Sequence, residues 1–207
     1  MTAHSTALTT SAPDHAPAAH AQGGISNVIL GMLLFITSEV MFFAGLFAAY
    51  FNVRANAPVW PPIEFHDKLH ILPLVGPATV LLILSSFTCQ IGVWAIRKND
   101  RRGLTRAIAV TVILGATFLV MQAIDYSALY SEGVRLDAGP FGTTYYTLTG
   151  FHGAHVLGGV LMLSVVLYRS MSGQFSSRHH DMVEAASMYW HFVDVVWILL
   201  FSTLYIL

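Results

Sequence analysis

The stretch Tyr189-Trp190-His191-Phe192-Val193-Asp194-Val195-Val196-Trp197 decides how the chain must fold. It lies within an apolar run over residues 185–207, which is long enough to cross a lipid bilayer as a helix. His191 and Asp194 are three residues apart and therefore share one face of that helix. An ionisable group at membrane depth costs roughly 2.5 kcal/mol or more. The pair must therefore be buried in protein, paired with other groups, or used.

The composition is that of an integral membrane protein. Of the 207 residues, 55% are hydrophobic and only 10% are charged, whereas soluble domains carry about 25% charged residues. Ten Lys and Arg residues against eleven Asp and Glu residues leave no basic footprint for nucleic acid. The single cysteine, Cys89, excludes an internal disulfide and a multi-cysteine metal site, and we interpret it as a small buried hydrophobe.

Five apolar segments are long enough to span a bilayer, which predicts an all-α polytopic bundle of five transmembrane helices. The expected spans are residues 25–53, 71–96, 104–130, 142–168 and 184–207. No soluble domain fits between them, so residues 25–207 are expected to form one membrane domain. Residues 1–24 are rich in Ala, Thr, Pro and His and contain no Lys or Arg. This composition predicts a disordered N-terminal tail.

The distribution of basic residues predicts the orientation of the bundle. Seven basic residues lie in or beside the connections after the second and fourth spans, and three lie on the other side. The seven are Arg97, Lys98, Arg101, Arg102, Arg106, Arg169 and Arg178, and the three are Arg54, Lys68 and Arg135. Cytoplasmic loops carry the excess of Lys and Arg, so we expect a cytoplasmic N-terminus and an external C-terminus.

Further ionisable residues lie at membrane depth in the first and fourth spans. Glu39 lies near mid-membrane and is either a protonated acid hydrogen-bonded to a facing helix or a proton-exchanging, partner-contacting carboxyl. His152 and His155 share a helix face and favour interhelical hydrogen bonding. The alternative is haem or metal ligation, in which His152 would pair with His191.

Polar residues nearer the helix ends need no special function. Gln122 and Asp125 are expected toward the outer end of the third span, with Asp125 accessible to water. Glu184 opens the fifth span, where the helix dipole stabilises a carboxylate. His179 and His180 precede it and are expected at the interface.

The deep polar groups constrain how the helices are arranged. Five unpaired groups at membrane depth would together cost roughly 12 kcal/mol. The first, fourth and fifth spans must therefore turn these faces toward one another or toward a partner protein. Small residues at positions 150, 154 and 158 allow another helix to approach the fourth span closely. The five groups are Glu39, His152, His155, His191 and Asp194.

Several stretches resemble subunit III of the haem-copper cytochrome c oxidases, in the short five-span bacterial form. They occur in the family's order between about Leu30 and Tyr205. The stretch 184–197 and the sequence Gly150-Phe151-His152-Gly153-Ala154-His155-Val156 are the most specific. The others are residues 38–45, 60–62, 142–144 and 179–180.

The resemblance implies a non-catalytic core subunit of a respiratory terminal oxidase, which reduces oxygen to water with electrons from cytochrome c. Such a chain binds no haem or copper, which lie in partner subunits, and has no nucleic-acid partner. It stabilises the catalytic subunit I beside subunit II, holds phospholipids, supports proton uptake and can enter a larger respiratory supercomplex. Its expected location is the bacterial plasma membrane, which it crosses several times.

The resemblance also implies which residues matter. Glu39 matches the family's carbodiimide-reactive carboxyl, and the other matching intramembrane polar positions are His152, His155, Glu184, His191 and Asp194. Trp60, Gln122 and Asp125 are secondary candidates. All are interpreted as a buried polar network or as lipid and subunit contacts, and none as a catalytic or metal-binding residue.

Two departures from the family pattern are visible. The mitochondrial form has two additional N-terminal helices that form one wall of a lipid cleft, so lipid binding here would need another subunit or be reduced. Asp125 stands where the family usually has glutamate. Three alternatives remain at this point: the same role in a quinol oxidase, the same role in a nitric oxide reductase-like assembly, or a self-contained haem-binding membrane cytochrome.

Overall fold

The computed structural model describes residues 25–60, 62 and 72–206. Five helices in this part of the chain are long and apolar enough to cross a membrane. They confirm the predicted all-α, five-span fold. The predicted disordered tail, residues 1–24, lies outside the described residues. The helices are α1 (Asn27–Asn56), α3 (Leu72–Arg97), α4 (Arg101–Ser131), α5 (Gly139–Met171) and α6 (Asp181–Phe201), which continues into a π-helical turn, Ser202–Ile206.

Local sequence features explain why α4, α5 and α6 begin earlier than hydropathy alone predicts. The carboxylate of Asp100 accepts the backbone N–H of Gly103 at 2.9 Å and starts α4 directly after α3. Asn99 adopts a left-handed φ of 61° and closes this short connection. Pro140 lies in the first turn of α5, where its missing N–H has no helical partner to lose. Asp181 and Glu184 occupy the first turn of α6.

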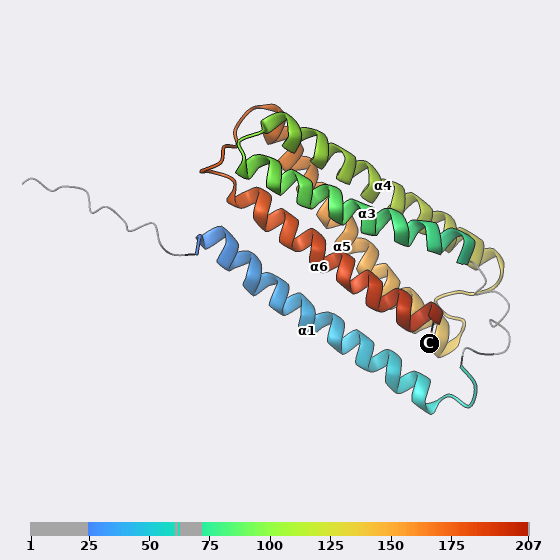
Figure 1. Cartoon of the computed structure of the whole chain (residues 1–207). Helices are drawn as coiled ribbons and strands as arrows, with labels where there is room; N and C mark the ends of the chain where they lie inside the picture. Colours follow the sequence, from blue (N-terminus) through green and yellow to red (C-terminus); the bar gives the residue numbers. More distant parts are fainter. Residues whose placement is uncertain (1–24, 61, 63–71, 207) are drawn as a thin grey trace, which may run out of the picture.

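Consecutive helices run antiparallel, and α3, α4, α5 and α6 form the body of the bundle (Figure 1). Helix α1 lies outside this body, along α5 and α6. The α3–α4 and α5–α6 connections lie at the end where α1 begins, and the C-terminus lies at the opposite end (Figure 1).

Trp190 is the centre of the packed core and is fully buried. A Cβ atom at Gly159 of α5 would lie 2.7 Å from Trp190 Cε3, and one at Gly115 of α4 would lie 2.5 Å from Cη2. The indole Nε1 donates to Ser85 Oγ of α3 at 2.9 Å. One residue of α6 thus contacts three other helices. The tightest approach to α5 falls at Gly159, one residue beyond the predicted stripe of positions 150, 154 and 158.

Candidate functional site

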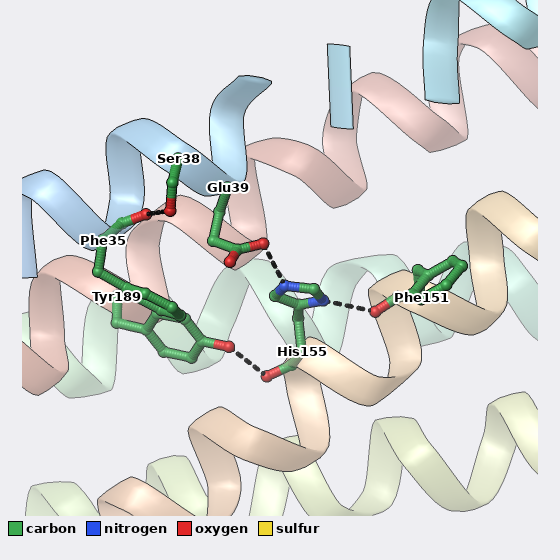
Figure 2. Close-up of polar contacts among 6 residues, drawn as sticks. All are labelled: Phe35, Ser38, Glu39, Phe151, His155 and Tyr189. Atoms are coloured by element: carbon green, nitrogen blue, oxygen red, sulfur yellow. Dashed lines mark hydrogen bonds and ion pairs between the residues drawn. The ribbon is translucent and has the colours of Figure 1, made fainter. Parts of the chain in front are cut away.

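The first polar cluster joins α1, α5 and α6 through the imidazole and backbone of His155 (Figure 2). Its Nε2 lies 2.9 Å from Glu39 Oε2 of α1. Its Nδ1 lies 2.7 Å from the carbonyl oxygen of Phe151, and the hydroxyl of Tyr189 donates to the carbonyl of His155 at 3.1 Å. The structure therefore brings together Glu39 and His155, which come from two separate predicted spans.

Hydrogen-bond chemistry fixes the number of protons in this cluster. A carbonyl oxygen only accepts, so Nδ1 of His155 must carry a proton that it donates to Phe151. The contact between Nε2 and Glu39 then holds one further proton, located either on the carboxyl or on the imidazole. In both arrangements the pair is neutral overall, which limits the cost of placing it inside a bilayer.

Aromatic rings surround the pair. The ring of Phe43 lies 5.0 Å from the His155 ring, centroid to centroid, and Phe42 lies 6.2 Å away. The side chains of His155 and Glu39 are 16% and 19% exposed. Ser38 does not join the cluster, because its hydroxyl donates to the backbone carbonyl of Phe35 in its own helix at 2.7 Å (Figure 2).

The second cluster joins α3 to α6 and contains the pair that opened the sequence. The hydroxyl of Ser86 donates to Asp194 Oδ2 and accepts from His191 Nδ1 at 3.0 Å. His191 Nε2 lies 3.3 Å from Gln90 Oε1. Sequence reasoning missed Ser86 and Gln90. Their signal was available: two polar residues four apart in an apolar span lie on one helix face.

This serine, histidine and aspartate do not form a nucleophilic triad. In such a triad the histidine stands between the serine and the carboxylate and removes the hydroxyl proton. Here Ser86 stands between His191 and Asp194, and its proton points to the carboxylate. Asp194 is buried, and its Oδ1 has no hydrogen-bond partner among the described residues. The arrangement links helices and does not activate a hydroxyl.

His152 belongs to neither cluster. It is fully buried between α5 and α6, where its Nε2 donates to the carbonyl of Val193 at 3.2 Å. Its ring lies 4.9 Å from the ring of Trp197, centroid to centroid. His191 points instead to α3. The two histidines therefore do not face each other across a common space, and the hypothesis that they pair on a haem is wrong for this fold.

Asp125 is buried, with 4% of its surface exposed, so the expectation of water access was wrong. Its Oδ2 accepts from the hydroxyl of Tyr145 at 3.2 Å, and that hydroxyl lies 2.6 Å from the hydroxyl of Tyr205. Helix α4 continues to Ser131, so Asp125 lies more than one turn inside it. The π-helical turn at the chain's end brings Tyr205 to this position.

The remaining candidate residues form hydrogen bonds between neighbouring helices or at helix ends. Gln122 Nε2 donates to the carbonyl of Thr149 on α5 at 2.9 Å. Trp60 Nε1 donates to the hydroxyl of Tyr50 at 3.1 Å, and that hydroxyl donates to the carbonyl of Thr203 at 3.0 Å.

Glu184 closes the end of the bundle where α3 ends and α6 begins. Its Oε1 accepts from Arg97 Nη2 at 2.8 Å and from Arg97 Nε at 2.9 Å. The same oxygen lies 3.2 Å from His180 Nε2. The polar residues thus form separate links between neighbouring helices. Among the described residues, no group of three or more His, Cys, Asp or Glu side chains is placed to hold a metal ion.

Comparison with known proteins gives a consistent result across nearly the whole chain. Residues 10–207 match the family model described as cytochrome c oxidase subunit III. The probable cytochrome c oxidase subunit 3 of Nocardia farcinica is 41% identical over 189 residues, which cover 90% of this chain and 91% of that protein. Cytochrome c oxidase subunit 3 of Corynebacterium diphtheriae is 42% identical over 181 residues, or 86% and 87% of the two chains. The Synechocystis protein of that name is 42% identical over 191 residues, or 91% and 80%.

Proposed function

Because the chain belongs to the cytochrome c oxidase subunit III family, we propose that it is a non-catalytic membrane subunit of a cytochrome c oxidase. In this role it is part of the haem-copper enzyme that reduces oxygen to water with electrons from cytochrome c. The observation that carries the proposal is the family match over residues 10–207. Subunits I and II are its partners and hold the haem and copper.

The two intramembrane clusters support a structural contribution to that enzyme. Only 6% of the residues in the most apolar stretch of α1 are buried within the chain. The contact of Glu39 with His155 therefore fixes a helix that packing alone holds weakly. Ser86 and His191 add a hydrogen bond between α3 and α6, which also pack closely. We assign these residues to maintaining the helix arrangement that the catalytic subunit contacts, and thereby to sustained proton uptake and turnover.

Phospholipid is the proposed cover for the outer face of α1. Most of its large apolar side chains are exposed, including Leu34 and Met41 at 65% and 73%. Apolar surface of this extent requires lipid tails or another membrane protein. We propose that lipid tails occupy this face and that subunits I and II contact other faces.

The bacterial plasma membrane, with the N-terminus in the cytoplasm, is the proposed location and orientation. The seven basic residues of the α3–α4 and α5–α6 regions belong to the bundle end where α1 begins, which supports this orientation (Figure 1). Of the three basic residues on the other side, Lys68 lies outside the described residues. Cysteine labelling of the variants Ser177→Cys and Glu132→Cys in intact cells tests the proposal. Only the Glu132→Cys variant should react with a membrane-impermeant reagent.

Affinity purification of the intact complex tests the function. The chain, tagged within residues 1–24, should co-purify in mild detergent with subunits that carry haem and copper. The preparation should consume oxygen with reduced cytochrome c as donor and be inactive with a quinol alone. A stoichiometric haem spectrum from the isolated chain would contradict the proposal, as would an oxidase whose turnover lifetime is unchanged when the chain is deleted.

A further inference from the structure

The first turns of α4 and the last turn of α5 enclose a shallow hollow with an unusual concentration of positive charge. Its volume is about 410 Å³, and its lining includes Arg101, Arg102, Arg106, Thr105 and Ser170. The hydroxyls of Thr105 and Ser170 lie 2.7 Å apart, and Ser170 is buried at 6% exposure. The hollow therefore has arginines along its edge and hydroxyl groups at its base.

The charge of the three arginines is not balanced from within the described part of the chain. Among the residues that the structure describes, no carboxylate forms an ion pair with Arg101, Arg102 or Arg106. Arg97, by contrast, forms an ion pair with Glu184, and Arg169 donates to the neutral amide oxygen of Gln174. Around the hollow, residues 97–124 contain a single acid, Asp100, and residues 160–180 contain none.

Asp100 cannot neutralise the group, because one carboxylate stands against three guanidinium groups. Its carboxylate accepts the N–H of Gly103 and caps α4. The guanidinium of Arg101 extends away toward the end of α5, where a Cβ on Gly173 would lie 3.5 Å from its Nη1. The hollow is left with net positive charge, and guanidinium groups favour phosphate because their planar N–H donors match its oxygens.

An apolar surface continues from the arginines toward the middle of the helices. Arg102 and Arg106 are followed on the same face of α4 by Val110 and Ile113, which are 44% and 64% exposed. On α5, the exposed residues below the hollow are Tyr168, Val165 and Leu161. This surface, with positive charge at the helix ends and two apolar stripes beside it, is complementary to an anionic phospholipid. The headgroup would lie at the membrane surface and the acyl chains along the helices.

We propose that the N-terminal turns of α4 and the last turn of α5 bind the headgroup of an anionic phospholipid. Basic pockets between transmembrane helices at the basic end of a bundle bind such headgroups. Arg101, Arg102 and Arg106 contact the phosphate, and the acyl chains lie over Val110 and Ile113. This site lies on α4 and α5 and does not depend on the proposed role of the chain in an oxidase, which rests on the family match and on the links of α1 and α3.

Native mass spectrometry of the detergent-purified intact complex tests the site. Added phosphatidylglycerol should bind more tightly than phosphatidylcholine to the wild type. The double variant Arg102→Gln/Arg106→Gln should weaken phosphatidylglycerol binding roughly 30-fold, since each basic residue near an anionic membrane surface contributes about 1 kcal/mol and 1.4 kcal/mol is tenfold. Lys98→Gln/Arg178→Gln is the matched control. It removes the same charge from the same end outside the hollow and should leave binding unchanged.

A second variant and a competition experiment distinguish the possible outcomes. Arg102→Lys/Arg106→Lys keeps the charge and should bind phosphatidylglycerol less tightly than the wild type but more tightly than the glutamine variant. This intermediate result separates a charge effect from misfolding if the glutamine variant assembles poorly. Inorganic phosphate at millimolar concentration should not displace the lipid. Equal binding of the two lipids, equal loss in the control variant, or displacement by free phosphate would overturn the proposal. So would crosslinking of residue 102 to an acidic segment of another subunit in place of a lipid.

Discussion

Helices α3 and α1 both contact α6, but they are attached to it by different means. Helix α3 is packed into the body, and its hydroxyl oxygens accept from two buried indoles: Ser85 accepts from Trp190 and Thr79 accepts from Trp197, at 2.9 and 3.0 Å. Helix α1 has only Phe43 and Tyr50 buried along its whole length. The position of α3 is therefore determined by packing, whereas that of α1 depends on a few polar contacts and on whatever covers its outer face.

Trp190→Ala should produce the largest effect, because it removes the side chain that contacts α3, α4 and α5 together. Truncation of a fully buried tryptophan costs about 3–5 kcal/mol, and the cavity would open between Gly115 and Gly159. We expect little assembled complex and a strongly lowered thermal midpoint in detergent. Trp94→Ala is the control, since Trp94 is 53% exposed. Equal losses in both variants would show that the core is not organised by packing on Trp190.

Glu39→Leu should release α1 while leaving the four-helix body intact. It deprives His155 Nε2 of its partner, and leaving a polar group without its hydrogen bond in an apolar setting costs about 1–3 kcal/mol. The distribution of distances between spin labels on α1 and α6 should broaden. The thermal midpoint of the four-helix body, α3 to α6, should stay nearly constant. Thr37→Val is the control, because Thr37 donates only to Leu33 of its own helix.

The double variant Glu39→Leu/His155→Leu sharpens this test. With both polar groups gone, no unpaired group remains in an apolar setting, so part of the lost docking should return. If the broadening of the α1–α6 distance distribution in the double variant equals the sum of the broadenings in the two single variants, the two side chains are not coupled. The difference between α1 and α3 would then have another cause.

Ser86→Ala should displace α3 less than Glu39→Leu displaces α1, although leaving a buried polar group without its hydrogen bond costs about 1–3 kcal/mol. It leaves His191 Nδ1 and Asp194 Oδ2 without their shared partner. The surrounding tryptophan contacts should still hold α3 in place. We expect faster loss of activity during turnover with unchanged haem spectra of the complex, and the same pattern for His191→Leu. Ser127→Ala, at an exposed position of α4, should be neutral. A lost haem signal in an assembled complex would contradict the structural role.

The sequence was sufficient to predict the number and type of helices, because a bilayer requires apolar segments of a definite length. It was less informative about the contacts between them. His152 and His155 are three residues apart, about 60° around the helix, and α5 lies against both α6 and α1. That rotation is enough to place His152 against Val193 and His155 against Glu39. A single shared face was therefore too coarse a description.

Two other features depended on helix pairing that hydropathy does not encode. Ser86 and Gln90 lie in a span recognised only by its apolar character, so nothing in their own segment identified His191 as their partner. Asp125 is buried because Tyr145 and the terminal turn with Tyr205 cover it. That covering requires the fifth span to return beside the third and fourth. Local position near a helix end did not predict burial.

Glu184→Gln should have the smallest effect and should separate surface charge from packing at the α3–α6 interface. The Arg97 and Glu184 side chains are 54% and 27% exposed, and exposed ion pairs contribute about 0.2–1 kcal/mol. Because salt screens such pairs over about 10 Å at 0.1 M, the variant should be slightly less stable than the wild type at low salt. The difference should vanish near 1 M salt, where the screening length falls to about 3 Å. Thermal midpoints of the intact complex across a salt series measure this difference, and Arg97→Gln should follow the same curve.

A loss of thermal stability that persists at high salt would mean that Glu184 holds α3 to α6 through more than charge. The contrast with α1, which depends on a few polar contacts such as that of Glu39 with His155, would then be weaker than the geometry implies.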